Sequence, residues 1–209
     1  MAKYEITKIE CPKCGKENSK HTWKNINIQT NPDLKNKVLN KELFKFKCIN
    51  CGYEAQLDYS LIYEDDYKIY YVTTQEELDE VLDLLNSKEE MADTDSKICR
   101  VVCSQEDLFE KIHLFDLKLD DRIIEIIKVL FYMNFKKQNQ VDIDAIYFDC
   151  IDNMYQLTFM NQGFEEGKVN FDMNLYNQIK DKYHSYLEED VRIDFDYAAS
   201  IIMKEQSQS

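Results

Sequence analysis

Hydrophobic and polar residues alternate in several short stretches of the chain, and this period of two predicts β-strands. The clearest case is ELFKFKC at residues 42–48, where Phe44 and Phe46 fall on one face and Lys45 and Lys47 on the other. The remaining predicted strands of the first half are YEITKI (4–9), HTWKNINIQ (21–29), YEAQLDYSLIY (53–63), YKIYYVT (67–73) and ICRVVC (98–103). The first third of the chain is therefore expected to consist mainly of strands.

Helices are predicted where a capping residue precedes hydrophobic residues at a spacing of three or four. Thr74 and Glu77 match the capping box, and Ser104 and Asp120 or Asp121 are the expected caps of the next two helices. The predicted helices cover residues 75–86, 105–115, 122–135 and 174–187, with a short helix beginning at Pro32 after an N-cap at Asn31. The stretch 121–135 is apolar on more than one face, which favours a central core helix over the alternative of a dimer seam.

The last third again alternates. AIYFDCI (145–151), MYQLTFM (154–160) and KVNFDM (168–173) predict a three-stranded meander with turns at DN and NQGFEEG. VRIDFDYAASIIMK (191–204) is compatible with a strand followed by a helix or with one edge strand, and SKEEMADTDSK (87–97) is expected to be a polar loop.

These elements predict an α+β fold. The first third of the chain is expected to be followed by a mixed α/β body that ends in a small antiparallel sheet. We expect a domain at residues 1–72 and an acidic α/β domain at 73–209, with a sub-boundary near residue 138. The change in composition near residue 60 supports the first boundary.

Charge is unevenly distributed along the chain of 209 residues, whose net charge is −14. Residues 1–60 carry 11 Lys against 7 Asp and Glu, a formal charge of +4, whereas residues 61–209 carry 15 Lys and Arg against 33 Asp and Glu, a formal charge of −18. No apolar stretch approaches the ~20 residues of a membrane span, and the first residues have no apolar segment typical of a signal peptide. We expect a cytoplasmic protein whose seven cysteines stay reduced.

Two cysteine pairs share the form C-x2-C-G, CPKCG at residues 11–15 and CINCG at 48–52. Two residues between the sulfurs allow one turn to direct both thiolates at the same point, and glycine readily takes the positive φ that such a turn needs. Two such turns supply four ligands, which is the number that a structural zinc ion binds. The sequence predicts a structural zinc ion bound by Cys11, Cys14, Cys48 and Cys51. The expected fold therefore begins with an N-terminal four-cysteine zinc ribbon that has a helical insertion between its two cysteine pairs. The alternatives are an iron site of rubredoxin type, redox-active cysteine pairs and buried free thiols.

These residues resemble the CpXC family. The similarity lies in CPKCG, Ile26-Asn27, Pro32, Leu43-Phe44, the second pair CINCG and the ending Ile62-Tyr63-Glu64-Asp65. It covers about residues 5–70 and extends toward residue 130 through LFEKIHLFDLKLDDRIIEIIK. Ile49 stands where the family frequently has proline. The resemblance implies a zinc-binding module with two cysteine turns and adds no activity.

Other candidate sites are weaker. Trp23 and five lysines, Lys35, Lys37, Lys41, Lys45 and Lys47, are candidates for a nucleic-acid surface, because lysine neutralises phosphate and exposed aromatic rings stack on bases. Aspartates two residues apart, Asp142 with Asp144 and Asp194 with Asp196, would share a strand face and could bind a divalent cation. The three histidines fall in different predicted elements, and His113 is expected at the surface or at its border.

We therefore expect a non-enzymatic, zinc-stabilised adaptor that acts through protein–protein contacts, with a basic protein as its partner or with a second copy of itself. The alternative is a nucleic-acid-binding zinc ribbon that uses the lysines of the N-terminal domain. A third candidate is a metal-dependent hydrolase with a site formed by aspartates. No contact with a membrane is expected.

Overall fold

The computed structural model describes residues 3–66, 68–86, 97–139, 141–152 and 154–208. The chain divides into two compact units, Met1–Phe109 and Glu110–Ser209, and the division falls within helix α3. The elements of the first unit are β1 (Lys3–Glu10), β2 (Glu17–Asn27), α1 (Asp33–Leu39), β3 (Lys45–Lys47), β4 (Glu54–Gln56), β5 (Leu61–Asp65), β6 (Lys68–Val72), α2 (Leu78–Asn86), β7 (Ile98–Val102) and the start of α3 (Gln105–Asp116). Those of the second are α4 (Asp121–Asn139), β8 (Ala145–Ile151), β9 (Met154–Asn161), β10 (Phe164–Phe171), α5 (Met173–Tyr183), the 3₁₀ helix η2 (His184–Tyr186) and α6 (Phe195–Gln208).

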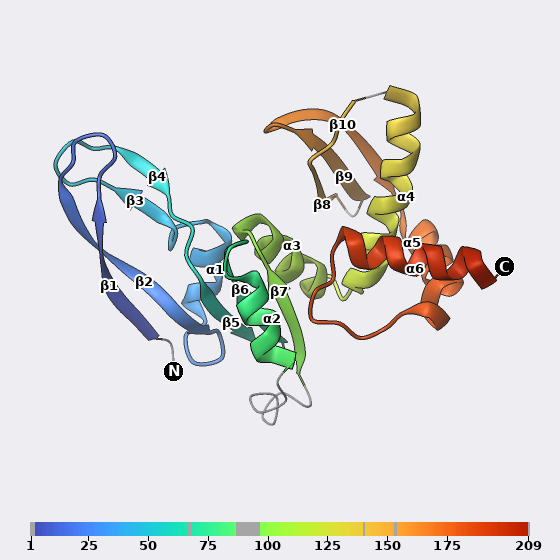
Figure 1. Cartoon of the computed structure of the whole chain (residues 1–209), viewed down its shortest axis with the longest axis horizontal. Helices are drawn as coiled ribbons and strands as arrows, with labels where there is room; N and C mark the ends of the chain where they lie inside the picture. Colours follow the sequence, from blue (N-terminus) through green and yellow to red (C-terminus); the bar gives the residue numbers. More distant parts are fainter. Residues whose placement is uncertain (1–2, 67, 87–96, 140, 153, 209) are drawn as a thin grey trace. The chain divides into compact units, whose positions relative to one another are not determined.

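The first unit is built on a five-stranded mixed sheet with the strand order β1-β2-β5-β6-β7 (Figure 1). β1 pairs with β2 and β5 with β6 in antiparallel fashion, whereas β2 and β5, and β6 and β7, run parallel. The chain passes through α2 between β6 and β7, since parallel neighbours need a crossover connection. The largest fully buried side chains of this unit include Phe44, Tyr63 and Tyr70.

A separate two-stranded sheet, β3 with β4, carries the second cysteine turn. The predicted alternation is present, because Phe44 and Phe46 are buried while Lys45 and Lys47 are exposed. The strands are shorter than predicted, and the single return strand expected at 53–63 is divided into β4 and β5. The Gln105 side chain donates hydrogen bonds to the Leu57 carbonyl at 2.8 Å and to Asp58 at 2.7 Å, which satisfies polar groups in the interrupted segment.

The short helix predicted near Pro32 is present as α1, but its predicted cap was wrong. Pro32 is the N-cap and makes no side-chain capping bond. The Asn31 side chain instead accepts a hydrogen bond from the Thr30 hydroxyl at 3.0 Å. The later caps are as predicted. Ser104 Oγ accepts from Asp107 N at 3.0 Å, and Asp120 Oδ1 accepts from Arg122 N at 3.0 Å.

The second unit contains the predicted meander, an antiparallel sheet with the order β10-β9-β8. The turn predicted over NQGFEEG is shorter, because β10 begins at Phe164 and only Gln162 and Gly163, both with positive φ, reverse the chain. α4 is a core helix: Ile123, Ile124, Ile126, Ile127 and Val129 are buried and pack in the cluster formed with the sheet, α5 and α6.

The segment 191–204, whose pattern left two alternatives open, has no strand, since residues 191–194 belong to no strand and α6 begins at Phe195. Asp194 explains the helix start. Its Oδ1 accepts a hydrogen bond from Tyr197 N at 3.0 Å, and its Oδ2 pairs with Arg192 Nε at 2.6 Å. An acidic N-cap satisfies a free amide of the first turn, which favours helix at this point.

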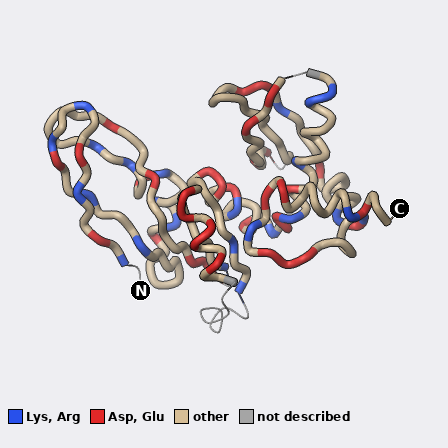
Figure 2. Tube along the Cα trace, viewed as in Figure 1, with Lys and Arg blue, Asp and Glu red and all other residues tan. Residues whose placement is uncertain are grey.

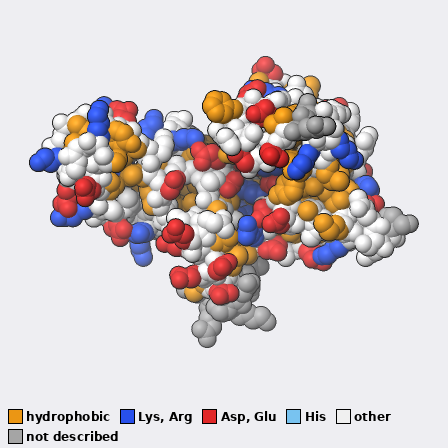
Figure 3. Space-filling model, turned by 45° about the horizontal axis from the view of Figure 1, so that its top comes forward, with side chains coloured by type: hydrophobic (Ala, Val, Ile, Leu, Met, Phe, Trp, Pro, Cys, Tyr) orange, Lys and Arg blue, Asp and Glu red, His pale blue; other side chains and the backbone are white. Residues whose placement is uncertain are grey.

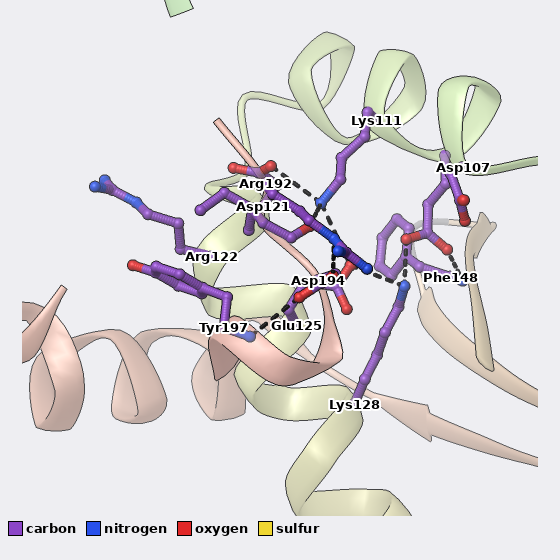
Figure 4. A network of polar contacts seen from close by, with 12 residues as sticks. Asp107, Lys111, Asp121, Arg122, Glu125, Lys128, Phe148, Arg192, Asp194 and Tyr197 are labelled. Carbon is purple, nitrogen blue, oxygen red and sulfur yellow. Dashed lines mark hydrogen bonds and ion pairs between the residues drawn. The ribbon is translucent and has the colours of Figure 1, made fainter. Parts of the chain in front are cut away.

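A buried charge cluster in the second unit joins α3 to α4 (Figure 4). It consists of Glu110, Lys111, Asp121, Glu125 and Lys128, all of them at most 8% exposed. Lys111 Nζ lies 3.1 Å from Asp121 Oδ2 and 3.4 Å from Glu125 Oε1, and it donates to the Ile193 carbonyl at 2.7 Å. Lys128 Nζ pairs with Glu110 and lies 3.1 Å from Glu125 Oε1. Glu110 also accepts a hydrogen bond from Phe148 N at 2.7 Å.

Electrostatics within this buried charge cluster favour charged lysines. Burial alone would lower the pKa of Lys111 and of Lys128, but the neighbouring carboxylates outweigh burial and raise both pKa values. Burial raises the pKa of the Glu110 carboxyl.

The division at residue 109 differs from the boundary expected after residue 72. β6 and β7 continue the same sheet as β1, β2 and β5, and all five strands therefore belong to the first compact unit. Whether residues 1–72 fold as a domain, and whether a sub-boundary exists near 138, stay predictions. Most of the polar loop predicted at 87–97 lies outside the described residues. Within the described parts of the chain, no helix is both long and apolar enough to cross a membrane.

Candidate metal centre

Two β-turn segments of equal length carry the four cysteines of the C-x2-C-G motifs. In the first, Glu10 pairs with Glu17, so CPKCGK connects β1 to β2. In the second, Lys47 pairs with Glu54, so CINCGY connects β3 to β4. Figure 1 shows the ends of these two hairpins next to each other. The sequence folds this way locally because each motif follows a strand and contains the glycine that the turn requires.

The two turns have the same hydrogen bonds. Cys11 N donates to Lys16 O at 3.0 Å and Gly15 N to Cys11 O at 2.9 Å. The second turn repeats this with Cys48 N to Tyr53 O at 2.8 Å and Gly52 N to Cys48 O at 2.9 Å. Gly15 and Gly52 both have positive φ, in the left-handed region that glycine occupies without steric cost. The two turns therefore share one backbone geometry.

The four sulfur atoms converge. Cys11 Sγ lies 3.7 Å from Cys51 Sγ, and Cys14 Sγ lies 3.6 Å from Cys48 Sγ. All four Sγ atoms lie within 4.8 Å of one another. These distances are too long for a disulfide bond, and none of the seven cysteines forms a disulfide. Four sulfurs bound tetrahedrally at a metal–sulfur distance of ~2.3 Å would lie about 3.8 Å apart. The four thiols can therefore hold one metal ion.

The surroundings of the sulfurs favour the thiolate form of Cys48 in particular. Cys11 and Cys48 are buried with Phe46, while Cys14 and Cys51 are half-buried. Burial alone would raise the pKa of the Cys48 thiol, but hydrogen bonds from the backbone of Cys51 and Asn50 and from the Asn18 side chain outweigh it and lower the pKa to about 6. These donors stabilise the thiolate form of Cys48, whereas the pKa of the neighbouring Cys14 thiol is raised to about 12 by burial and by its contacts with the other three cysteines.

Asn18 was not predicted from the sequence as part of this centre. It is 5% exposed, and its Nδ2 donates to Lys16 O at 2.8 Å and to Cys48 Sγ at 3.5 Å. Its Oδ1 accepts from Ile49 N at 2.9 Å. Asn18 therefore joins the start of β2 to the second cysteine turn. In the sequence Asn18 is only a polar residue between two predicted strands, and its hydrogen-bond partners Cys48 and Ile49 are about 30 residues away.

Comparison with known families identifies residues 9–128, more than half of the chain, as matching the family described as CpXC protein. The chain belongs to the CpXC family. No curated protein and no solved structure matches the chain. The CpXC match begins near the end of β1, contains both cysteine turns and ends at Lys128 within α4. It therefore includes all five members of the buried charge cluster as well as the metal centre.

In this CpXC protein, replacing Asn18 by leucine is expected to weaken the binding of a divalent metal ion by about 10- to 100-fold, because groups that orient metal ligands typically have effects of this size. The substitution removes the donor to Cys48 Sγ and leaves Ile49 N without its acceptor. Competition with a chromophoric chelator measures the affinity. Asn18→Asp keeps the acceptor and should recover part of the loss, and Ser19→Ala at an exposed β2 position is the control. Unchanged affinity in both Asn18 variants would contradict the assignment.

Neither aspartate pair belongs to a cluster of three or more potential metal ligands within the described residues. Among the described residues, the four cysteines are the only group of three or more potential ligands that lie close enough together. The prediction that these aspartates lie on strands was wrong. Asp142 and Asp144 precede β8, and Asp144 Oδ2 accepts a hydrogen bond from Gln162 N at 2.7 Å. Asp194 and Asp196 lie at the start of α6, where Asp194 acts as a cap.

Three of the five lysines predicted to bind nucleic acid form ion pairs within the chain. Lys35 pairs with Asp65 at 2.8 Å, Lys41 with Glu106 at 2.8 Å and Lys47 with Glu54 at 2.7 Å. Lys37 and Lys45 are exposed. The Trp23 ring contacts the Tyr4 ring with 5.5 Å between centroids. Figure 2 shows the basic residues of the N-terminal strands interspersed with acidic ones. Nucleic-acid binding by these residues stays a prediction.

The remaining candidates lie outside the metal centre. Cys99, Cys103 and Cys150 form no disulfide and do not belong to the cluster. His113 is half-buried on α3, in accord with the expected border position, and its ring lies 6.1 Å from that of Phe148. His21 stacks on Tyr4, and His184 contacts the Asp181 carbonyl at 2.8 Å.

Proposed function

We propose that this CpXC protein is a non-enzymatic adaptor whose first unit is a zinc ribbon, stabilised by one zinc ion bound to Cys11, Cys14, Cys48 and Cys51. The observation that carries this proposal is the convergence of the four sulfurs within 4.8 Å. Closed sites of four cysteines are a usual arrangement for structural zinc. Iron bound by four cysteines is the alternative, and elemental analysis separates the two.

The donor set supports a structural role for the ion. Catalytic zinc typically has three protein ligands and a coordination position for water or substrate. Here four thiols supply the complete tetrahedral set, and Asn18 contacts Cys48 from the side. When bound, the ion would supply a cross-link between the β1–β2 turn and the β3–β4 turn. The helix α1 lies in the chain between these two turns and forms the helical insertion of the proposed ribbon.

A basic protein is the proposed partner. Helix α2 and the residues before it expose Glu76, Glu77, Asp79, Glu80 and Asp83, and no ion pair involves these five side chains within the described part of the chain. Figure 2 shows acidic residues along this helix. A surface of one charge attracts a partner of opposite charge and accelerates association at low salt. The contact with a partner would therefore weaken as ionic strength rises.

The test is capture of partners from the host by the intact protein, with metal content measured on the same sample. We expect one zinc per chain and a basic protein that is lost when Glu76, Asp79, Glu80 and Asp83 are all replaced by their amides. Neutralising the exposed Asp149 and Glu166 in the second unit is the matched control and should retain the partner.

Two other outcomes of this capture would overturn parts of the proposal. Nucleic acid that is captured at low salt and lost when Lys37 and Lys45 are replaced by glutamine would favour the alternative ribbon function, because those two lysines are exposed. A chain without stoichiometric metal would refute the zinc ribbon.

A further inference from the structure

β1 is an edge strand that pairs along its whole length with one neighbouring strand, β2. All eight of its residues, Lys3–Glu10, pair with β2, and β1 ends the strand order of the five-stranded sheet. Its other edge has no strand against it within the described residues. No proline interrupts β1, and its one register irregularity lies at Lys3/Tyr4. An extended edge of this kind presents unpaired backbone groups that can receive another strand.

One face of the edge is apolar. Tyr4 and Ile6 are 55% and 64% exposed, and on the same face their β2 partners are Trp23 and His21. The Tyr4 ring stacks on His21 with 4.7 Å between centroids. Exposed hydrophobic side chains that adjoin one another commonly mark an interaction surface. Figure 3 shows hydrophobic side chains at the surface of the lobe that holds the N-terminal strands, with basic residues around them.

The sequence of β1 is compatible with pairing to itself. When two identical strands pair antiparallel around a two-fold axis perpendicular to the sheet, residues that face one another have numbers with a constant, even sum, because the axis keeps each side chain on its own face. A centre at Glu5 or at Lys8 places like charges opposite each other, which is unfavourable. A centre at Thr7 places Ile6 opposite Lys8 and Tyr4 opposite Glu10 of the second copy.

A centre at Ile6 places Ile6 opposite Ile6 of the second copy, Tyr4 opposite Lys8, and Glu5 opposite Thr7. In this register no like charges meet, and the most exposed apolar side chain of β1 packs against its own copy. The Tyr4, Ile6, His21 and Trp23 side chains of both copies then lie on one face, where Ile6 meets Ile6 at the axis and Lys8 of each copy lies beside Tyr4 of the other. The basic balance of residues 1–60 also distinguishes this contact region from the acidic remainder of the chain.

We propose that the chain forms a two-fold dimer in which the β1 strands of two copies pair antiparallel about Ile6 and join the two five-stranded sheets. The dimer adds a defined surface to the proposed adaptor and does not depend on the identity of the metal. Because the remainder of each copy is strongly acidic, moderate salt should favour the dimer by screening repulsion between the copies.

Analytical ultracentrifugation of the full chain over a range of concentrations tests the dimer. The natural sequence is expected to dimerise, and Ile6→Lys should raise the dissociation constant by about tenfold or more, because two like charges would face each other across the axis. Phe164→Lys is the matched control, since Phe164 is 73% exposed in the second unit. Metal content measured on every variant shows that the cysteine turns are intact. A monomer at all concentrations, or a dimer unaffected by Ile6→Lys, would overturn the proposal.

Cross-linking tests the register. Mild oxidation of Ile6→Cys is expected to give a disulfide between the two introduced cysteines, which peptide mapping distinguishes from the seven natural thiols. Thr7→Cys lies one residue away and faces Glu5 of the second copy in this register, so it should cross-link much less. Preferential cross-linking of Thr7→Cys would refute the centre at Ile6. If the dimer forms but the metal content is below one ion per chain, the zinc ribbon is contradicted and the dimer is supported.

Discussion

Replacing Cys48 by serine is expected to unfold the two cysteine turns and to abolish stoichiometric metal binding. Cys48 is 1% exposed, and its sulfur lies 3.6 Å from Cys14 Sγ. A structural zinc ion contributes about 10–16 kcal/mol to the folding of small zinc modules, which is comparable with the whole free energy of unfolding of a typical domain, about 5–15 kcal/mol. The few buried side chains around the sulfurs, chiefly Phe46, cannot replace that contribution. Addition of a strong chelator should have the same effect.

Hydrogen–deuterium exchange of the full chain measures this loss by region. We expect protection of backbone amides to disappear in β1–β4 and to persist in β8–β10, which belong to the other compact unit. Cys150→Ser is the control, because Cys150 is a half-buried cysteine of β8 that lies outside the metal centre. Full protection of β1–β4 in metal-free Cys48→Ser would show that the turns fold without an ion and would contradict the proposed role of zinc.

The second large effect is expected from Lys128→Met, which should lower the free energy of unfolding by about 3–5 kcal/mol, since removing one partner leaves buried charges uncompensated. Lys128 Nζ lies 3.1 Å from Glu125 Oε1 and also pairs with Glu110. Methionine preserves most of the hydrophobic packing of the lysine stem, so the loss reports the charge. Urea denaturation of the full chain, monitored through a spectroscopic signal from the second unit, measures the change in the free energy of unfolding.

A second substitution separates charge from packing in the buried charge cluster. Combining Lys128→Met with Glu110→Gln removes one charge of each sign and should recover a part of the lost stability, giving a favourable coupling energy in the double-mutant cycle. Lys137→Met in the last turn of the same helix is the control, because Lys137 is exposed. Exposed substitutions of this kind typically alter the free energy of unfolding by no more than about 0.5 kcal/mol. Equal effects of Lys128→Met and Lys137→Met would contradict the importance of the buried charge cluster.

The candidate metal ligands could be predicted because the information is local. Each C-x2-C-G motif determines its own turn, and the matching hydrogen bonds of Cys11 and Cys48 show that the same local sequence produced the same backbone. The equal motifs also indicated that both pairs would serve one site. Asn18 could not be predicted, because its role depends on how β2 approaches the β3–β4 turn, and nothing in the residues around it encodes that approach.

Local pattern also predicted most elements, including the C-terminal meander and the helices capped by Ser104 and Asp120. It was less successful where a tertiary contact altered a local preference. The segment after β4 leaves the strand where Gln105, far along the chain, binds Leu57 and Asp58. Asp196 was expected on a strand, but the cap formed by Asp194 starts a helix there.

By itself, the sequence determined which four cysteines converge, the membership of the CpXC family and the mixture of helices and strands, because turn geometry, motif spacing and hydrophobic period act over a few residues. Only the tertiary structure decided that β1 forms an edge with Tyr4 and Ile6 exposed, and that Lys111 and Lys128 share buried carboxylates. Strand order and the pairing of buried charges depend on contacts between segments distant in the chain, for which a single sequence contains no direct signal.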